Sequence, residues 1–348
     1  MITISACLIV KNEERVLARC LDCIKQIADE IIVVDTGSSD GTIDIARKYT
    51  SKIYEFAWVD DFSKARNFSF SKATTEYIYV ADADEIIEEE QIQKILMLKA
   101  NLSNDIEIVQ MYYSNQLEFN TTYNFDREYR PKLYKRLREF IWIDPLHEYV
   151  RLEPVIFDSD IVITHKPLES HANRDFAIFQ KALQRGVVFS NKLIAMYARE
   201  LWIAGNDRDF IKAYPYFSLL LEDTMEETLY RQCQCVVARA ARLMGNGETF
   251  FQVCLKNVAQ EHVSAEVCFE LGEYYLEKGN PKEAILWYYN AAFETGAELN
   301  LRFHGDYPRI KLYECYELLN NKEEANAYQE QANKWLEENL GGETKYEG

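Results

Sequence analysis

The chain has 348 residues, more than one small domain uses and enough for two domains of ordinary size. Its hydrophobic fraction of 48% and charged fraction of 28% are those of a globular protein, which excludes disorder as the main state. The formal net charge of −18 repels phosphate backbones and anionic lipid, so binding to nucleic acid or to membranes is disfavoured. No apolar run reaches the ~18 residues of a membrane span, and the first residues lack the basic start of a signal peptide.

The eight cysteines show no disulfide framework. Cys20 and Cys23 have the spacing of a metal-binding pair, but both fall within an apolar helical pattern. Reduced thiols in a hydrophobic core are therefore expected, and with them a cytoplasmic protein without membrane insertion.

The first half of the chain alternates short apolar runs with helical patterns. Strands are expected at residues 4–10, 31–34, 52–56 and 77–80, and helices at residues 16–27, 42–49 and 63–72. Asn12 is the expected N-cap of the first helix, and Asp40 or a close neighbour that of the second. This alternation predicts right-handed crossovers and a mostly parallel sheet with flanking helices, an α/β Rossmann-like fold.

Polar residues follow three of these strands, at residues 11–13, 35–40 and 82–85. Ligands of parallel sheets bind at the carboxyl ends of the strands, so the three clusters are expected to meet on one edge. From about residue 106 to 162 the pattern changes to aromatic-rich short strands with no clear helix.

The second half has continuous helical periodicity and contains a repeat. Large, small, aromatic and turn residues occupy the positions typical of a tetratricopeptide repeat: Leu271, Gly272, Tyr275, Gly279, Ala284, Tyr288 and Ala291, with a degraded copy at Leu312, Tyr316, Asn320, Ala325 and Ala332. Helix pairs that cannot bury their own faces stack on one another in such arrays. Helical hairpins are expected to turn at residues 205, 245, 279 and 320. The expected domains are residues 1–170 and 171–340, followed by a flexible tail at 341–348.

Asp82 and Asp84 form a D-x-D pair directly after a predicted buried strand. Carboxylates of this kind are hard oxygen ligands for Mg²⁺ or Mn²⁺, which keep waters and bind substrate phosphates. Asp35 ends another strand beside Gly37, and Arg66 precedes the D-x-D strand. Neither a G-x-G-x-x-G nor a P-loop motif follows the first strand, which argues against a dinucleotide enzyme and a P-loop enzyme.

Residues 8–14, 33–42, 65–67 and 82–85 resemble, in order and spacing, the family 2 glycosyltransferases of the GT-A fold. The chain looks like the branch with a helical tetratricopeptide-type C-terminal domain, which includes bacterial enzymes that glycosylate peptides and surface structures. His147-Glu148 and His165 resemble later elements of that branch.

The resemblance implies an inverting transferase that uses a nucleotide sugar and Mn²⁺ or Mg²⁺. Asp35 would then read the uracil of a UDP-sugar, Arg66 would contact the nucleotide or diphosphate, and Asp84 would bind the metal, with Asp82 nearer the ribose or sugar. His165 would be a third metal ligand or a diphosphate contact, although a structural hydrogen bond is an alternative. The nucleotide-sugar site is completed by residues of the matching motifs: Val10, Lys11, Glu13, Gly37 and Ala83.

The general base that accepts the acceptor proton is expected in residues 142–148. Glu148 is the first candidate, with Asp144 and His147 as alternatives; a salt bridge from Glu148 to Arg151 is its structural interpretation. The expected donor is UDP-glucose or UDP-N-acetylglucosamine. The expected acceptor is a Ser, Thr or Cys side chain of a peptide or protein, or alternatively a cell-surface polysaccharide or lipid-linked glycan.

Two other functions compete with this one. A nucleotidyltransferase needs a glycine-rich basic loop after the first strand, and residues 11–15 contain no glycine and two acids. A catalytically inactive repeat scaffold is disfavoured by the presence of Asp35, Arg66, Asp82 and Asp84. The helical repeats would supply a groove for a peptide acceptor or a surface for homodimer formation.

Overall fold

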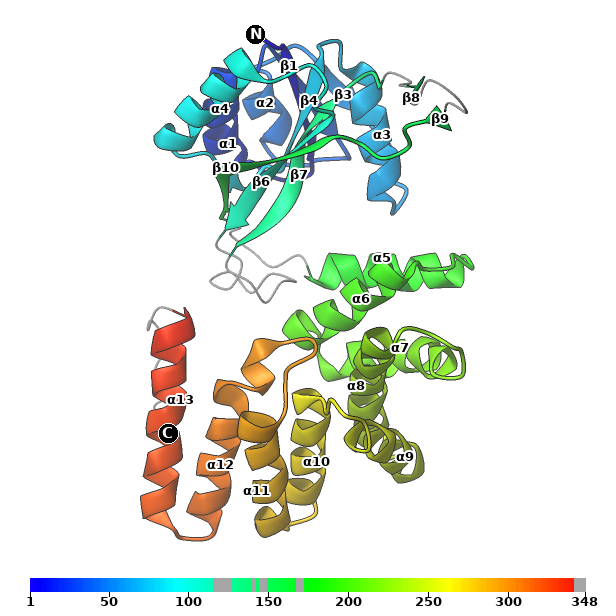
Figure 1. Ribbon diagram of the computed structural model, residues 1–348, viewed down its shortest axis with the longest axis vertical. Coiled ribbons are helices and arrows are strands. Elements are labelled where there is room, and N and C mark those ends of the chain that lie inside the picture. The colour runs from blue at the N-terminus through cyan, green and yellow to red at the C-terminus, as the bar shows by residue number, and fades with distance from the viewer. Residues whose placement is uncertain (115–126, 139–141, 144–148, 167–171, 341–348) are drawn as a thin grey trace. The chain divides into compact units, whose positions relative to one another are not determined.

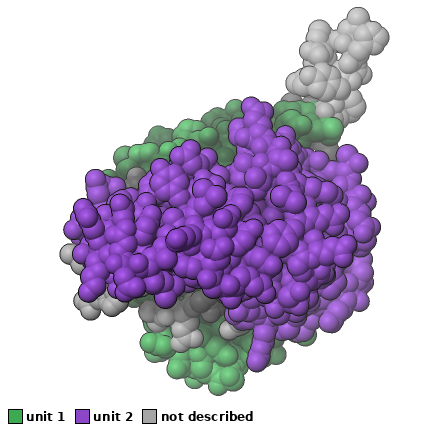
Figure 2. Space-filling model, turned by 90° about the horizontal axis from the view of Figure 1, so that it is seen from below, with its two compact units in different colours: residues 1–119, 125–170 green, residues 120–124, 171–348 purple. Residues whose placement is uncertain are grey.

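A computed structural model describes residues 1–114, 127–138, 142–143, 149–166 and 172–340. The chain divides into two compact units (Figure 2), unit 1 with residues 1–119 and 125–170, and unit 2 with residues 120–124 and 171–348. Within the described residues, no helix is both long and apolar enough to cross a membrane. All eight cysteines are free thiols, and seven of them are buried.

Unit 1 is built on one sheet of eight described strands (Figure 1). The strands are β1 (Ile4–Val10), β2 (Glu30–Asp35), β3 (Ile53–Glu55), β4 (Tyr77–Ala81), β5 (Glu85–Ile86), β6 (Ile108–Ser114), β7 (Arg127–Lys135) and β10 (Ile156–His165). Their order is β3-β2-β1-β4-β7-β6-β10-β5, and a separate two-stranded ribbon pairs β8 (Trp142–Ile143) with β9 (Tyr149–Val150). Only β7 and β5 run against the other strands of the sheet. The predicted mostly parallel α/β sheet is thereby confirmed.

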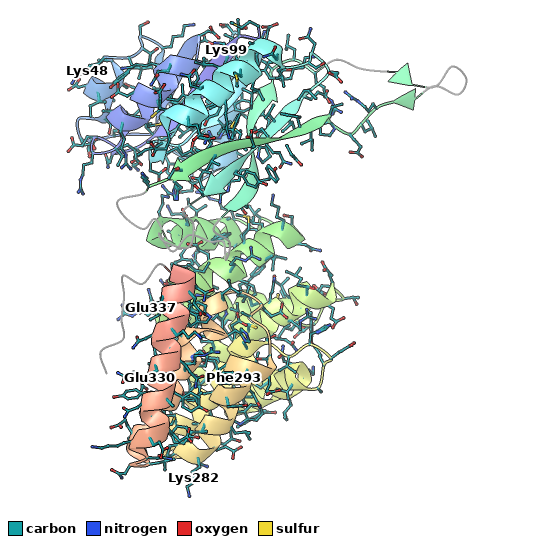
Figure 3. All side chains as sticks on the ribbon, turned by 60° about the vertical axis from the view of Figure 1, so that its left-hand side comes forward. Lys48, Lys99, Lys282, Phe293, Glu330 and Glu337 are labelled. Carbon is teal, nitrogen blue, oxygen red and sulfur yellow. The ribbon has the colours of Figure 1, made fainter. Side chains whose placement is uncertain are left out.

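Helices cover both faces of this sheet. They are α1 (Leu17–Ile27), α2 (Thr42–Ala46), α3 (Phe62–Lys72) and α4 (Glu89–Asn101). Alternate residues of β1 face opposite sides, so Leu8 joins a core with α1, α2 and α4, whereas Cys7 joins a smaller core beside α3. Lys99 near the end of α4 (Figure 3) is buried, and its ammonium group donates to the Ile27 carbonyl and pairs with Asp29 at 2.7 Å. That contact holds the end of α4 against the end of α1.

Three local expectations in unit 1 differ from the structure. The first helix begins at Leu17, and Asn12 does not cap it, because Asn12 has a positive φ of 56° and its side chain binds the next loop. The second helix ends at Ala46 rather than at residue 49, although Asp40 does accept the Thr42 amide at its start. Helix α4 has no counterpart among the predicted elements.

The regular elements in the described residues of unit 2 are helices and helical turns (Figure 1). Its elements are α5 (Ala172–Gln184), α6 (Asn191–Ala204), α7 (Asp207–Leu220), α8 (Glu227–Leu243), α9 (Gly247–Val258), α10 (Ala265–Glu277), α11 (Pro281–Tyr289), the π-helical turn η1 (Asn290–Glu294), the 3-10 turn η2 (Leu301–Phe303), α12 (Asp306–Leu318) and α13 (Lys322–Leu340). Three successive hairpins are formed by α8 with α9, α10 with α11 and α12 with α13, as predicted from the repeat, whereas α6 and α7 each pack against α8 rather than against each other.

All four predicted turn positions lie between consecutive helices, and the helices on either side pair with each other at residues 245, 279 and 320 but not at residue 205. Gly245, Gly279 and Asn320 have φ near 70°, 71° and 57°, the left-handed conformation that ends a helix. A side chain at Gly272 would place its Cβ 2.5 Å from the Tyr288 ring, so α10 and α11 approach closely because residue 272 is glycine. The Arg309 guanidinium carbon lies over the ring of Phe293 on η1 (Figure 3), 4.6 Å from the centroid of that ring.

Candidate active site

Three loops of unit 1 meet at the carboxyl ends of neighbouring parallel strands. Strand β1 lies between β2 and β4, with Val10 in register with Asp35 and Leu8 in register with Ala81. The polar residues that follow these strands therefore lie side by side, as the sequence predicted.

The first two loops are joined by hydrogen bonds. The side-chain Oδ1 of Asn12 accepts the Ser39 backbone amide at 2.8 Å, and the backbone amide of Asn12 donates to the Ser38 hydroxyl at 2.9 Å. The Glu13 amide donates to the Thr42 hydroxyl, also across the two loops. Because each loop satisfies the polar groups of the other, the two form one preorganised surface.

Asp35 lies at the centre of this surface and is 3% exposed. Its carboxylate accepts the amides of Gly37 and Ser38 at 3.0 and 3.1 Å, and Gly37 has a φ of 102° that favours glycine. Asp35 thus shapes its own loop, and its contact with a base stays a prediction. Beside it, Val10 is buried, whereas Lys11 is exposed and extends from the end of β1.

Asp82 and Arg66 form an open ion pair on the neighbouring strand and helix. The Asp82 Oδ1 atom lies 3.5 Å from the Arg66 guanidinium, and the Asp82 side chain is 48% exposed. Desolvation acts to raise the pKa of Asp82, but Lys132, Arg66 and other nearby cations outweigh it and lower that pKa. One Arg66 nitrogen, Nη1, is buried and has no partner within the described residues. Asp82 is therefore ionised at neutral pH, and Arg66 keeps a hydrogen-bond donor for an anionic ligand.

Asp84 is held by the last sheet strands rather than by Arg66. Its Oδ2 atom lies 2.9 Å from His165 Nε2, and its backbone carbonyl accepts the Lys166 amide. The other ring nitrogen, His165 Nδ1, is buried without a hydrogen-bond partner in the described part of the chain. The antiparallel pairing of β5 with β10 brings the two residues together, since Glu85 stands in register with His165.

Asp84 and His165 suit a divalent metal only in part. Across the described ranges, no group of three His, Cys, Asp or Glu side chains gathers as a complete metal site. A carboxylate oxygen suits both Mn²⁺ and Mg²⁺, whereas an imidazole nitrogen suits transition metals better than Mg²⁺; ions of this kind leave positions for water and substrate phosphates. The donor set therefore fits a metal whose coordination is completed by a diphosphate.

A buried ion pair lies behind the D-x-D turn and was not predicted from the sequence. Lys132 on β7 is 4% exposed, and its Nζ atom lies 2.5 Å from Glu85 Oε1 and 3.1 Å from the Val80 carbonyl oxygen. Burial raises the pKa of Glu85 to about 7, although Lys132 acts to lower it. The residues next to Lys132, Pro131 and Leu133, do not indicate whether a lysine at this position of a strand is buried or exposed. Lys132 thus fixes the two strand ends that carry Asp82 and Asp84.

The remaining predicted site residues divide into two groups. Ala83 is buried between the two aspartates, and Glu13 is half-buried where the β1 loop meets α1. The candidates for the general base, Asp144, His147 and Glu148, lie outside the described residues. The structure therefore brings together the predicted donor-side residues and leaves the choice of base as a prediction.

Residues 5–151 match the family model described as Glycosyl transferase family 2. A TPR repeat-containing protein of Synechococcus elongatus is 47% identical over 85 residues, which cover 24% of this chain and 21% of that protein. The SPbeta prophage-derived glycosyltransferase SunS of Bacillus subtilis is 41% identical over 96 residues, 27% of this chain and 22% of that protein. Among solved structures, glucosyl-3-phosphoglycerate synthase of Mycobacterium tuberculosis aligns at 16% identity with a TM-score of 0.38, over 55% of this chain and 82% of that chain.

The chain spans about a fifth of the length of these two sequence relatives. Unit 1 nevertheless carries a family 2 glycosyltransferase domain, because the family model extends over its first three loops and most of its sheet. The predicted family resemblance is confirmed, and a helical unit of the tetratricopeptide type follows the domain.

Proposed function

We propose that the protein is a metal-dependent, inverting glycosyltransferase that moves a hexose, glucose or N-acetylglucosamine, from a UDP-sugar to a side chain of a polypeptide. The observation that carries this proposal is the grouping of Asp82, Asp84 and Arg66 beside the Asp35 loop, within the region that matches the family model. Eight free cysteines suit a reducing compartment, so we place the reaction in the cytoplasm.

On the donor side, the residues of unit 1 divide the work of holding a nucleotide diphosphate. Arg66 has an unpartnered nitrogen for an anionic oxygen, and the two joined loops around Asp35 offer a rigid surface to the nucleoside. Asp84 and His165 would hold Mn²⁺ or Mg²⁺, which when bound neutralises charge on the departing diphosphate. The ionised Asp82 would lie beside the ribose or the sugar.

On the acceptor side, one carboxylate suffices for the chemistry. A general base takes the proton from the acceptor hydroxyl or thiol as that atom attacks the anomeric carbon, and UDP leaves from the opposite face. A single displacement inverts the anomeric configuration and needs no covalent sugar–enzyme intermediate. Glu148 is the first candidate for the base, followed by Asp144 and His147. The helical unit would bind the polypeptide that carries the acceptor side chain.

The proposal is tested by thermal shifts of the full chain with a panel of nucleotide sugars, with and without Mn²⁺. A ligand at about 100 times its dissociation constant stabilises a protein by ~2.7 kcal/mol, which is easily measured. We expect a metal-dependent shift with one UDP-sugar, lost in Asp84→Ala but kept in Asp44→Ala, whose side chain is exposed on α2. In Asp84→Ala, sugar transfer should fall by about 100-fold or more. No shift with any nucleotide, or an equal shift in Asp84→Ala, would reject the proposal.

A further inference from the structure

The helical unit contains a pocket of about 260 Å³ that the donor chemistry does not use. It lies among three helices, α7, α8 and α9, of which α7 and α9 each pack against α8. Six neutral hydrogen-bonding side chains line it: Tyr214, Ser218, Tyr230, Gln234, Thr249 and Gln252. Drug-sized sites begin at about 300 Å³, so a pocket just below that volume suits one small ring.

Gln234 on α8 is fully buried and leaves a hydrogen-bond donor for this pocket. The Ser264 amide donates to Asn257 Oδ1 at 3.0 Å, so the other end of that side chain, Asn257 Nδ2, is the group that donates to Gln234 Oε1 at 2.9 Å. These contacts fix the remaining atom, Gln234 Nε2, as an NH₂ group. It has no hydrogen-bond partner within the described residues. Buried donors are nearly always paired, so Gln234 indicates a ligand with an acceptor atom.

A second buried polar atom without a partner belongs to the same pocket, on the facing helix. It is Ser218 Oγ on α7, which forms no hydrogen bond within the described part of the chain. Ser218 and Gln234 are not partners of each other, since neither atom has a hydrogen bond. Both groups are neutral, and a hydroxyl both donates and accepts. The pocket therefore offers two separate hydrogen-bonding positions to one ligand.

The charges at the mouth of the pocket favour a neutral ligand. Lys256 on α9 and Glu222 just after α7 are exposed lining residues, and among the described residues neither forms an ion pair. An anion drawn to Lys256 would meet Glu222 and the net charge of −18 of the chain. A cation would meet Lys256 and the donor of Gln234. A ligand without charge avoids both conflicts.

A sugar ring fits these groups better than the amide of a peptide side chain. An amide has one carbonyl oxygen and two N–H groups at one end, whereas the six neutral side chains come from three helices. A hexose has hydroxyls around its whole ring. Tyr214 and Tyr230 are half-buried, and in the described ranges their rings pack against no other aromatic ring. They are therefore available to the apolar face of a sugar.

We propose that this pocket binds one neutral hexose unit, with one sugar hydroxyl accepting from Gln234 Nε2 and another paired with Ser218 Oγ. The hexose is one without a phosphate, because the diphosphate of a nucleotide sugar would be repelled by Glu222. The pocket lies within unit 2, so it is a second sugar site in addition to the donor site of unit 1. The inference goes beyond the proposed function, and only the choice of glucose and N-acetylglucosamine as probes rests on that function.

The test uses the full chain and saturation-transfer difference NMR, with methyl β-glucoside, methyl β-N-acetylglucosaminide and a serine peptide that carries the same sugar. Ser218→Ala removes a hydroxyl without a partner, so the melting temperature should stay unchanged while sugar affinity falls about threefold. Gln234→Met keeps the side-chain volume and should weaken affinity about tenfold. Two variants are used because Gln234 also binds Asn257. The matched control Gln331→Met, exposed on α13, should leave the affinity unchanged.

Four results would overturn the inference. They are no binding of either methyl glycoside at millimolar concentration, affinity unchanged in both folded variants, displacement by a UDP-sugar with Mn²⁺, which would place the hexose at the donor site, and displacement by N-acetylglutamine amide, which would assign the pocket to a peptide side chain. Equal affinity for the methyl glycoside and the glycopeptide supports a site for any such hexose, and tighter binding of the glycopeptide supports a site for a sugar on its polypeptide.

The same measurements separate this inference from the proposed function. Sugar binding that weakens in Ser218→Ala, in a protein that transfers no sugar, rejects the proposed function and supports the pocket. Sugar transfer by a protein that binds neither methyl glycoside rejects the pocket alone.

Discussion

Each unit of the molecule buries a carboxylate, and the two carboxylates are held in different ways. In unit 2, Glu266 is fully buried and accepts the backbone amides of Glu298, Leu299 and Asn300 at 3.0, 2.7 and 2.9 Å. In unit 1, Glu85 is 3% exposed and has one side-chain partner, Lys132, whereas its Oε2 atom lacks a partner within the described residues. Burial raises the pKa of both groups.

This difference indicates that Glu266 stabilises the fold of unit 2, whereas Glu85 helps to position the candidate site of unit 1. Glu266 satisfies a stretch of backbone that has no helix or strand of its own, so it attaches the segment before η2 to α10. Glu85 directly follows Asp84, and its lysine partner also binds the Val80 carbonyl at the end of β4. The incomplete pairing of Glu85 lies where the donor is expected, whereas the complete pairing of Glu266 lies within the helical unit.

The largest expected loss of stability follows the replacement of Glu266, the carboxylate with three amide partners. In Glu266→Ala two buried amides and one part-buried amide lose their acceptor, which should lower the free energy of unfolding of unit 2 by about 3–6 kcal/mol. Urea unfolding followed by far-ultraviolet circular dichroism measures the loss. Glu266→Gln keeps one acceptor oxygen and should lose less. A loss below about 1 kcal/mol in Glu266→Ala would show that the segment finds other acceptors.

A smaller loss of stability is expected when Glu85 loses its partner Lys132. Lys132→Met leaves Glu85 buried without its cation, which should cost about 3–5 kcal/mol if Glu85 stays charged, and less where it takes up a proton. The double variant Lys132→Met/Glu85→Leu removes both buried charges and should recover most of the stability in the same urea assay.

The activity of that double variant shows whether the Lys132–Glu85 pair positions the candidate site or only stabilises the fold. Lys132 binds both the Val80 carbonyl and Glu85 and so positions the strand ends next to Asp82 and Asp84; its loss should therefore weaken donor affinity even in a stable protein. We expect the KM for the UDP-sugar to rise by about tenfold. Full recovery of both stability and transfer would mean that the pair serves the fold alone.

The sequence predicted the parts of unit 1 that depend on local periodicity and on strand ends. The runs at β1, β2 and β4 consist mostly of apolar residues, which marks them as buried strands, and the polar clusters after them must meet if the strands are parallel. The prediction that Asn12 caps the first helix was wrong because its side-chain Oδ1 accepts the Ser39 amide on another loop, a contact that no local pattern encodes. Lys132 was missed for the same reason, since its partners lie 47 and 52 positions away along the chain.

In unit 2 the repeat predicted the hairpins, because glycine and small residues mark turns and close helix contacts directly in the sequence. Gly272 against Tyr288 and the turn at Gly279 follow from that pattern. A cavity in unit 2, lined by residues of α6, α8, α10 and α12, was not predicted. It depends on which side chains of α6, α8, α10 and α12 meet, and the irregular repeat does not specify this.

A third carboxylate, Glu200 on α6, is also buried, and the smallest of the expected changes in stability concerns it. Glu200 is 7% exposed, and its Oε2 atom has no hydrogen-bond partner within the described part of the chain. Burial raises the pKa of Glu200 to about 7; Asp175 acts in the same direction and Arg174 opposes it.

The folded chain therefore holds a proton on Glu200 more tightly than the unfolded chain, and stability falls as pH rises from about 4.5 through about 7. Glu200→Gln removes the ionisation, so the variant should be more stable than wild type by about 1–3 kcal/mol at pH 8 and nearly equal to it at pH 5. Urea unfolding of both proteins at several pH values measures the difference. A difference that does not change with pH would mean that Glu200, like Glu266, has amide partners in solution that offset its burial.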